Sequence, residues 1–491
     1  VGKIHNLRLA RKRLHALEIP AGAVFSFWKQ LGRASTTNGF VIGRELREGC
    51  VVPAVGGGLC QVSNAIYDSA VRAGLEVVER HRHSRVLPGS LAEHDRDATV
   101  FWNYLDLRLR APFAWRLEVE LDAQKLRVRI RGHAQQVAIA QPIALRARTI
   151  ESTGDCTSCD QTDCNSHVGP QVASRHRTWL LCDPWPEFLA LRERELDGRD
   201  RTLGLPSHGD RRRFDSLARL HAALRTRWAL WRGQPLPKAR GGGLEIVAHA
   251  LARKLRPDDL HLVVEQGLLP YLWRAGELAG RRFDVLMNAL PMDAIQQRLD
   301  QAAALHPESA TLRDFRAPTE LLKAEREALA HAGHWISPHE RILALAGDRA
   351  TRLDWMAPSH CHARVVRCDG LPTILFPASA LARKGVLELV AALQGLRVRV
   401  IAPFGATESE TVWAEIAVER VASIDAGLAL ADLVVLPAWI EHQPRSLLAA
   451  IARGIPVIAT AACGLPLSAQ WECIPEGDAV ALRRAIVQRI G

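Results

Sequence analysis

The feature that most narrows the fold is a regular alternation of strand-like and helical segments in the C-terminal part of the chain. Short runs rich in Val, Ile and Leu are followed by stretches with helical periodicity. Strands of one parallel sheet must be joined by crossovers, which helices usually provide. The alternation therefore predicts a doubly wound α/β sheet. The expected strands are 374–376, 398–401, 433–436 and 456–460, and the expected helices are 385–393 and 445–452.

The chain has 491 residues, which is too long for one ordinary hydrophobic core, so we expect a multidomain protein. Residues 1–135 combine an expected helix with period-two strands and should form an α+β domain. Residues 136–175 read as a cysteine-rich connector. Residues 176–365 and 366–491 should form the two halves of a doubly wound, Rossmann-like α/β body.

Composition and charge limit where the chain works and what it binds. Hydrophobic residues make up 48% and charged residues 24%, and no stretch reaches the roughly 18 uncharged apolar residues of a membrane span. The first residues are basic, without the apolar run of a secretory leader, so we expect a cytoplasmic protein. A net charge of +11 favours anionic partners: nucleotide sugars, acidic glycans, or an anionic membrane surface touched peripherally. Nucleic acid is not an expected partner, because no DNA- or RNA-binding motif is present.

Three consecutive glycines precede the most informative cysteine of the chain. Gly56, Gly57 and Gly58 lead through Leu59 to Cys60, and a run with helical periodicity follows. The spacing predicts a helix that starts at or next to Cys60. A thiol there lies at the positive end of the helix dipole, among unpaired backbone N–H groups. This position lowers the pKa of the thiol and favours the nucleophilic thiolate.

A histidine and a carboxylate follow Cys60 in an order that suits a thiol enzyme. His83 is the candidate to accept the thiol proton, and Asp97 is the candidate to orient the imidazole. The order Cys, His, Asp is the one used by transglutaminase-like thiol enzymes. Each residue also has a structural interpretation, with Cys60 as a small buried residue at a tight turn and Asp97 as a cap or turn residue.

Several ordered segments of the first 135 residues carry a family resemblance. They are Pro20-Ala21-Gly22, Phe25-Ser26-Phe27, the run from Gly56 to Ser63, Tyr67, Glu79-Arg80, His83-Ser84 and the run from Asp97 to Val100. Together they resemble the VanW family, which is named for an accessory protein of glycopeptide-resistance clusters and is associated with the bacterial cell envelope. The resemblance implies a connection to the envelope and does not supply a reaction.

A cluster of soft ligands lies in the connector: Cys156, Cys159, Cys164 and His167. Three thiolates and one imidazole satisfy a tetrahedral zinc ion in a closed, structural site. An iron–sulfur cluster is the alternative metal centre, and a loop of free or disulfide-paired thiols is the interpretation without a metal. A zinc ion here would join the N-terminal domain to the C-terminal body.

The C-terminal part contains a second set of motifs. One is the basic loop Arg383-Lys384-Gly385, which follows the expected strand 374–376, and the other is the segment 429–464, which includes Glu441. These motifs resemble the donor-binding half of GT-B retaining glycosyltransferases of the family 4 type. A strand that ends in a loop at a helix N-terminus, with cations nearby, is suited to phosphate groups.

The GT-B resemblance implies a nucleotide-sugar donor held by four residues, Arg383, Lys384, Gly385 and Glu441. It also implies that residues 176–365 are an atypical N-terminal, acceptor half. The motif departs from the family at Ala449, where such enzymes usually carry a second glutamate that grips the donor ribose. The resemblance in fold is therefore stronger than the indication of activity.

Three functional hypotheses follow. The first is transfer of a sugar from a nucleotide sugar to a glycan or cell-wall precursor of the envelope. The second places the chemistry in the N-terminal domain, as a Cys60-dependent thiol acyl-transferase or amide hydrolase acting on envelope material. The third is a scaffold for envelope assembly that has no catalytic activity.

Overall fold

The structure of the protein is a computed structural model. The structure describes residues 1–47, 50–83, 90–132, 176–204, 224–356 and 370–490, except for 226, 229, 230, 232–235, 315, 467 and 469. The chain forms two compact units. The first contains Val1–Thr178 with the short segments Ala252–Leu262 and Leu272–Arg282, and the second contains the remainder.

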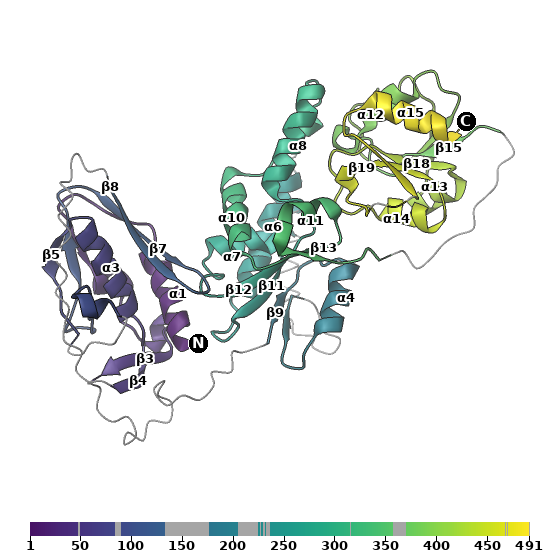
Figure 1. Cartoon of the computed structure of the whole chain (residues 1–491). Coiled ribbons are helices and arrows are strands. Elements are labelled where there is room, and N and C mark those ends of the chain that lie inside the picture. Colours follow the sequence, from purple (N-terminus) through teal and green to yellow (C-terminus); the bar gives the residue numbers. More distant parts are fainter. Residues whose placement is uncertain are drawn as a thin grey trace. The chain divides into compact units, whose positions relative to one another are not determined.

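The first unit is an α+β structure built on small antiparallel sheets (Figure 1). One sheet has the strand order β1-β7-β8, a second has the order β2-β6-β5, and β3 and β4 form a hairpin. Helix α1 packs against β7, and helix α3 packs against β8. The helices are α1 (Gly2–Leu14), α2 (Phe27–Leu31) and α3 (Cys60–Arg72). The strands are β1 (Leu17–Ile19), β2 (Val24–Ser26), β3 (Ile42–Arg47), β4 (Cys50–Val55), β5 (Glu76–Glu79), β6 (Arg108–Arg110), β7 (Trp115–Leu121) and β8 (Leu126–Gly132).

The core of the first unit forms where the apolar faces of α1 and α3 meet the sheets. Val62, Ile66 and Ala70 recur at helical spacing along α3, and each of them is completely buried. Trp115, Leu117 and Val119 alternate along β7 and point to the same core. Helix α3 is therefore held along its whole apolar face, which fixes the position of its first residue, Cys60.

In the second unit, the first sheet has the strand order β10-β9-β11-β12-β13-β14. The pairs β12–β13 and β13–β14 are parallel. Its strands are β9 (Thr178–Leu180), β10 (Arg201–Leu203), β11 (His261–Glu265), β12 (Arg282–Leu286), β13 (Trp335–Ser337) and β14 (Ala350–Arg352). The helices of this part are α4 (Pro186–Glu195), α6 (Leu236–Ala252), α7 (Leu269–Arg274), α8 (Met292–Leu305), α9 (Thr311–Asp314), α10 (Thr319–His331) and α11 (Glu340–Ala346).

The last sheet has the strand order β17-β16-β15-β18-β19-β20, and all five pairings are parallel. Helices α12 and α15 cover one face, and α13 and α14 cover the other (Figure 1). The strands are β15 (Thr373–Leu375), β16 (Arg399–Pro403), β17 (Val418–Val421), β18 (Leu433–Leu436), β19 (Val457–Thr460) and β20 (Trp471–Ile474). The helices are α12 (Val386–Leu393), α13 (Ile424–Leu430), α14 (Arg445–Ala452) and α15 (Ala479–Ile490). This strand order is that of a Rossmann fold.

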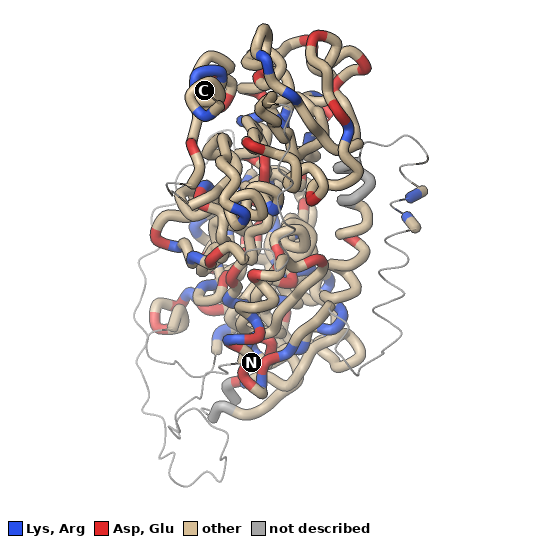
Figure 2. The backbone as a smooth tube through the Cα atoms, turned by 90° about the vertical axis from the view of Figure 1, so that its right-hand side faces the viewer, with Lys and Arg blue, Asp and Glu red and all other residues tan. Residues whose placement is uncertain are grey.

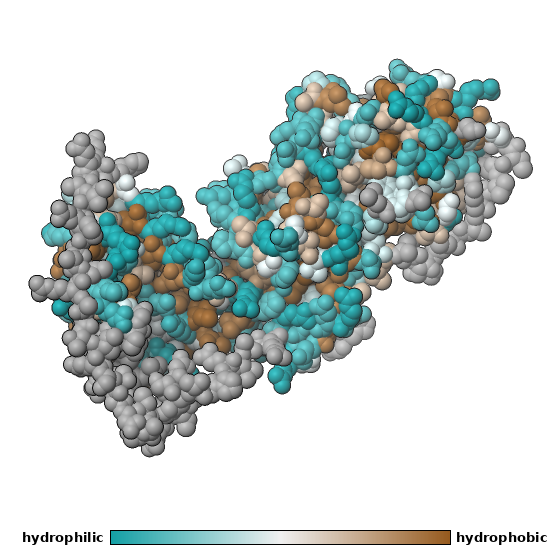
Figure 3. Space-filling view, in the orientation of Figure 1, coloured by the Kyte–Doolittle hydropathy of each residue, from teal (hydrophilic) through white to brown (hydrophobic). Residues whose placement is uncertain are grey.

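The predicted fold class is confirmed: an antiparallel α+β part is followed by a doubly wound α/β body with two six-stranded sheets. The division into residues 1–135, 136–175, 176–365 and 366–491 stays a prediction. Lys and Arg are interspersed with Asp and Glu along the described chain (Figure 2), and hydrophobic side chains reach the surface of both units (Figure 3).

Candidate functional site

The backbone beneath Cys60 is packed so closely that it excludes side chains. A Cβ atom on Gly2 would collide with the carbonyl oxygen of Ile42, and Cβ atoms on Gly43 or Gly57 would collide with each other's backbone. The start of α1, the hairpin strand β3 and the glycine loop therefore meet main chain to main chain. Glycine is the residue type that permits such an approach.

A buried asparagine connects these three segments. Asn6 in α1 donates from Nδ2 to the carbonyl oxygens of Val41 and Gly57, both at 3.0 Å, and its Oδ1 accepts from the backbone N–H of Val41 at 3.0 Å. The side chain is completely buried, so these bonds satisfy groups that water cannot reach. Asn6 thus fixes the loop that leads into Cys60.

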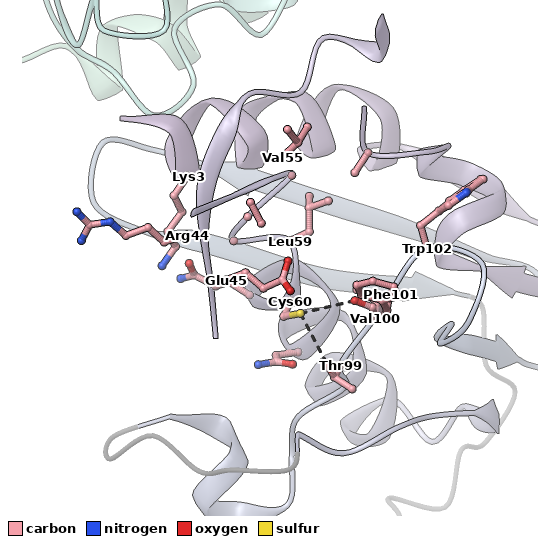
Figure 4. A pocket seen from close by; sticks show the side chains of 18 of the residues that line it. Lys3, Arg44, Glu45, Val55, Leu59, Cys60, Thr99, Val100, Phe101 and Trp102 are labelled. Carbon is pink, nitrogen blue, oxygen red and sulfur yellow. Dashed lines mark hydrogen bonds between the residues drawn. The ribbon is translucent and has the colours of Figure 1, made fainter. Parts of the chain in front are cut away.

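Cys60 is the first residue of α3, as the glycine run predicts. Its Sγ lies 3.8 Å from Thr99 Oγ1 and 3.9 Å from the carbonyl oxygen of Val100 (Figure 4). The backbone N–H of Cys60 belongs to the first turn of the helix, where helical geometry supplies no intrahelical acceptor. The thiol therefore stands at the N-terminal end of a fully supported helix.

The structure brings Cys60, His83 and Asp97 together, although 22 residues separate the first two in sequence. A side-chain hydrogen bond joins Cys60 to His83. On the other side of the ring, His83 Nδ1 lies 2.7 Å from Asp97 Oδ2, which also accepts the backbone N–H of His83 at 2.7 Å. The three side chains form a chain of contacts from thiol to imidazole to carboxylate.

Asp97 is fully buried and held by a neighbouring arginine. Arg80 donates from Nη2 to Asp97 Oδ1 at 2.9 Å and from Nε to the carbonyl oxygen of Asp97 at 2.7 Å. The guanidinium group lies over the ring of Tyr67, 4.7 Å from its centroid. Arg80 thus neutralises the buried carboxylate and limits its rotation.

The electrostatics of this cluster favour an ion pair between thiolate and imidazolium. Burial alone raises the pKa of Cys60, but the hydrogen bond from His83 and contacts at Val100 and Thr99 outweigh it, so the pKa lies below its ordinary value. Burial lowers the pKa of His83, yet its bonds to Asp97 and Cys60 raise it to about 9. Although burial opposes ionisation, bonds from His83 lower the pKa of Asp97 to about 2. At neutral pH the imidazole of His83 and the carboxylate of Asp97 are thus charged, and the lowered pKa of Cys60 increases its thiolate fraction.

Asn64 lies one helical turn after Cys60, on the same face of α3. Its Oδ1 accepts the backbone N–H of Ala98 at 2.8 Å. Ser63 donates to the carbonyl oxygen of Ala98 at 2.5 Å. These two bonds attach α3 to the segment that carries Asp97 and Thr99, so they fix the position of Cys60 relative to that segment.

The cluster opens into a large groove of the first unit. Its volume is about 1910 Å³, and Cys60, His83, Asn64 and Thr99 are among the lining residues. Figure 4 shows Cys60 between two kinds of wall: Lys3, Arg44 and Glu45 lie on one side, and Phe101 and Trp102 lie on the other. The groove therefore reaches the thiol from solvent and extends well beyond it.

The predicted donor-binding residues lie in loops at the point where the strand order of the last sheet reverses. Strand order progresses from β15 outwards through β16 and β17, and from β18 outwards through β19 and β20, so the switch lies between β15 and β18. Ligands of open α/β sheets collect at the carboxyl ends of such neighbouring strands. The loop after β15 carries Arg383, Lys384 and Gly385, and the loop after β18 carries Glu441.

Within this second site, the cation and the carboxylate already contact each other. Lys384 Nζ lies 3.0 Å from Glu441 Oε2 and 3.0 Å from the carbonyl oxygen of Ile440. Burial tends to raise the pKa of Glu441, but the charge of Lys384 and the N–H of Gln443 lower it, so the carboxylate is ionised. The side chain of Glu441 is 15% exposed.

The two loops are locked together by their backbones. The carbonyl oxygen of Arg383 accepts the N–H groups of Trp439 and Ile440, both at 3.1 Å. Gly385 has a φ of +79°, and a Cβ there would collide with the carbonyl group of Pro437. Glycine is thus required at position 385 for both reasons.

Three further residues of this region lie near the predicted donor-binding residues or were singled out for an absent glutamate. His339 Nε2 lies 2.9 Å from the carbonyl oxygen of Glu441, and the buried His442 Nε2 has no hydrogen-bond partner in the described structure. Burial and nearby cationic groups lower the pKa of His442 to about 3, so it is neutral. Ala449, at the position of the missing glutamate, packs in the hydrophobic core.

The predicted metal ligands Cys156, Cys159, Cys164 and His167 lie outside the described residues. Among the residues that the structure does describe, no cluster of His, Cys, Asp and Glu side chains is arranged to hold a metal ion. Likewise, none of the described helices is both long and apolar enough to span a bilayer.

Sequence comparison finds a family match in the first unit. Residues 2–131 match the family profile described as VanW like protein. YoaR of Bacillus subtilis is 33% identical over 106 residues, which are 22% of this chain and 34% of that protein. The vancomycin B-type resistance protein VanW of Enterococcus faecalis is 30% identical over 129 residues, which are 25% of this chain and 47% of that protein. The matches thus span less than half the length of either relative.

Structural comparison of the chain finds glycosyltransferase-type proteins. A sucrose-phosphate synthase from Thermosynechococcus elongatus has a TM-score of 0.39 at 15% identity, with 64% of this chain and 89% of that chain covered. HepE of Anabaena, solved with UDP and glucose, has a TM-score of 0.37 at 15% identity, with 64% and 91% covered. The strand order, and not these likenesses, defines the fold of the α/β body. Residues 2–131 of the chain therefore form a VanW domain, which precedes a body with two six-stranded sheets.

Proposed function

We propose that the VanW domain is a thiol acyl-transferase or amide hydrolase in which Cys60 is the nucleophile. The observation that supports this proposal is the convergence of Cys60, His83 and Asp97 in one hydrogen-bonded chain that opens into a groove. A buried structural cysteine needs neither an imidazole partner nor a carboxylate behind that imidazole.

The chemistry divides among the three side chains. The Cys60 thiolate attacks the carbonyl carbon of an amide, and the electron pair of the C=O bond moves to oxygen. As this pair returns, the C–N bond breaks, and His83 gives its proton to the leaving amine. An acceptor amine or water, deprotonated by His83, then attacks the thioester and releases the thiolate. Asp97 keeps the imidazole oriented and stabilises its charge.

We assign the stabilisation of the oxyanion in this reaction to two N–H groups. One is the backbone N–H of Cys60 at the start of α3, and the other is the side-chain amide of Asn64, whose oxygen is already engaged by Ala98. Removing one such donor lowers turnover by about a hundredfold to a thousandfold in a well-studied hydrolase. We assign the positioning of Asp97 to Arg80.

The direct test is formation of an acyl-enzyme. The protein is mixed with p-nitrophenyl acetate, and intact-mass spectrometry is used to count acetyl groups that hydroxylamine removes. We expect one such group on the native protein and none on Cys60→Ala, whereas Cys473→Ala, which removes an exposed cysteine, should behave as the native protein. Equal acetylation of the native protein and Cys60→Ala would refute the proposal.

A second candidate function resides in the α/β body, and the observation that favours it is the placement of Lys384 and Glu441 at the switch point of the last sheet. We propose that this half binds a nucleotide sugar, with Lys384 facing the phosphates and Glu441 the sugar or ribose, and transfers the sugar to an envelope glycan. HepE, a structural relative, was solved with UDP and glucose. Calorimetric titration with uridine, guanosine and thymidine diphosphates tests this proposal.

The envelope setting is also a proposal. One relative is named a vancomycin resistance protein. We propose that the substrate of the VanW domain is amide-linked envelope material, reached from the cytoplasm at an anionic membrane surface. Retention of the protein on sedimented anionic vesicles, compared with neutral vesicles, tests the membrane part of this proposal.

A further inference from the structure

The walls of the Cys60 groove differ in chemistry on the two sides of the thiol. On one side lie the cationic side chains of Lys3 and Arg44, with Glu45 as the single carboxylate among the lining residues (Figure 4). Arg33 is a third cation that lines the groove. Within the described part of the chain, none of these three cations has an ion-pair partner, so their charge is available to a ligand.

On the other side lies a turn that presents aromatic rings. Phe101, Trp102 and Tyr104 line the groove, and their exposed fractions are 46%, 38% and 76%. Large aromatic side chains that stay exposed on a folded surface commonly mark a contact site. Their density here, within four residues of sequence, marks this wall as the apolar part of the binding surface.

The aromatic turn is held in place rather than loosely exposed. The N–H groups of Phe101 and Leu105 each donate to the other's carbonyl oxygen at 2.9 Å, and Trp28 Nε1 donates to the carbonyl oxygen of Leu105 at 2.8 Å. Trp102 also packs edge-on against Trp28, with 5.6 Å between ring centroids. A ligand that stacks on this wall therefore meets preorganised rings and orders few side chains.

The size of the groove argues for a chain-like ligand. Pockets for small molecules usually measure about 300 to 1,000 Å³, and this groove is about 1910 Å³. The thiol lies between the two walls and not at one end, so a substrate must extend in both directions from its reacting carbonyl. A single compact metabolite would leave one of the walls unused.

We infer that the groove takes an extended acidic peptide, with a carboxylate-bearing part against Lys3 and Arg44 and an apolar side chain against Phe101 and Trp102. The inference rests on the proposed function, because it places the amide that reacts at Cys60 between these two parts. Aromatic and basic side chains together also occur at membrane surfaces, but a flat bilayer does not enter a groove.

Binding to the Cys60→Ala variant tests the inference without chemistry. Two fluorescein-labelled peptides of equal length are used, which share one Leu and one Phe and differ in carrying two Glu or two Lys. We expect the acidic peptide to bind at least about tenfold more tightly, the effect of one charge-assisted hydrogen bond. Adding Arg44→Gln should remove most of this preference, and adding Tyr104→Ala should weaken both peptides.

Matched controls separate these effects from general damage. Arg116 is an exposed arginine of β7 that does not line the groove, and Phe404 is an exposed aromatic residue of the second unit. Arg116→Gln and Phe404→Ala should leave the affinity of both peptides unchanged. Equal binding of the two peptides, or a loss in Arg116→Gln as large as in Arg44→Gln, would overturn the inference.

Two further outcomes distinguish this inference from the proposed function. If Cys60 is acylated in the native protein but the acidic peptide has no advantage, the thiol enzyme stands and the substrate class is wrong. If the acidic peptide binds selectively while Cys60 resists acylation, the binding site stands without the reaction. Binding of Cys60→Ala to anionic vesicles that is lost in Tyr104→Ala would instead assign the aromatic wall to a membrane and overturn the peptide assignment.

Discussion

The Cys60 site and the Lys384 site both contain paired charged groups, but they differ in which group remains available to a ligand. Around Cys60, the charged groups pair in a line that ends at a thiol facing an open groove, so the last member remains available to a substrate. At the switch point of the last sheet, Lys384 is bound to Glu441 and to a backbone carbonyl, so the cation must exchange partners before it binds a phosphate. In a preorganised site, the group that binds the substrate is available before the substrate arrives. In the Lys384 site, that group is already bound to other groups of the protein.

The largest effect should come from His83. Replacement by Gln keeps a polar side chain but removes the acid and base of the reaction, which typically contributes about a hundredfold to ten-thousandfold in rate. We expect a loss of this size in acylation of Cys60 by p-nitrophenyl acetate, with the fold intact by circular dichroism. His81→Gln, two residues away and paired with Glu79, is the control and should remain near the native rate. A His83→Gln rate within twofold of native would place His83 outside the reaction.

Lys384→Ala should have the next largest effect, on nucleotide binding. A charge-assisted bond to phosphate contributes about 1.5 to 3 kcal/mol, so affinity should fall roughly tenfold to a hundredfold. Because Lys384 must first leave Glu441, and because Ala449 offers no ribose contact, we expect the native affinity to be weak already. Calorimetry with uridine diphosphate measures both values. Binding that Lys384→Ala leaves unchanged, or no heat at millimolar nucleotide, would make the second site structural only.

The buried carboxylate of Asp97 should make stability depend on acid. Its pKa is about 2 in the folded protein against 3.8 ordinarily, so its stabilisation is present above pH 3.8 and is lost as pH falls through 2. At about 1.4 kcal/mol per unit, the loss is roughly 2 kcal/mol. Urea unfolding of native protein and Asp97→Asn should therefore differ at pH 5 and converge near pH 2. A difference that does not change with pH would contradict the assigned shift.

The smallest effect is a rate ratio between two cysteines of the same molecule. The pKa of Cys60 is lowered, whereas burial and Glu476 raise the pKa of Cys473. Thiolate fractions differ by about tenfold for each unit between two pKa values, so iodoacetamide should label Cys60 first at pH 7 even though Cys473 is more exposed. Peptide mapping by mass spectrometry measures the two rates. Faster labelling of Cys473 would show that exposure and not ionisation controls reactivity.

The same ion pair sets the upper pH limit of the reaction. The raised pKa of His83 means that the imidazolium is present at neutral pH and is lost as pH rises through about 9. Acyl transfer from an amide, which needs a proton for the leaving amine, should decline above pH 9, while alkylation of Cys60 should not decline. A decline of both reactions together would indicate unfolding.

Much of the N-terminal site could be predicted because its members lie in recognisable local contexts. The glycine run marked the start of α3 at Cys60, and His83 and Asp97 lay in segments that resemble the VanW family. The structure adds physical roles to other residues of those segments: Arg80 holds Asp97, Tyr67 lies under Arg80, and Ser63 attaches α3 to Ala98. These contacts join residues distant in sequence, which spacing alone does not determine.

What sequence reasoning missed depends on tertiary contact. No sequence pattern marks the antiparallel pair of β3 and β4, in which Arg44 lies opposite Pro53. Asn6 and Asn64 carry no local signal, since their amides act on partners from other segments. Helix α1 ends at Leu14, because Ala16 adopts a φ of 65° and donates its N–H to the carbonyl oxygen of Leu117.

The contact between Gly43 and Gly57 has a consequence for how this domain can change over time. Gly43 and Gly57 both line the groove, and their main chains approach so closely that neither position has room for a Cβ atom. Replacing either glycine by alanine, which adds a single methyl group, would force the two main chains apart and displace Cys60. Residues such as Arg44 or Tyr104, whose side chains project freely, can vary one at a time. Substitutions in the two walls can therefore change what the groove binds, whereas positions 43 and 57 must remain glycine.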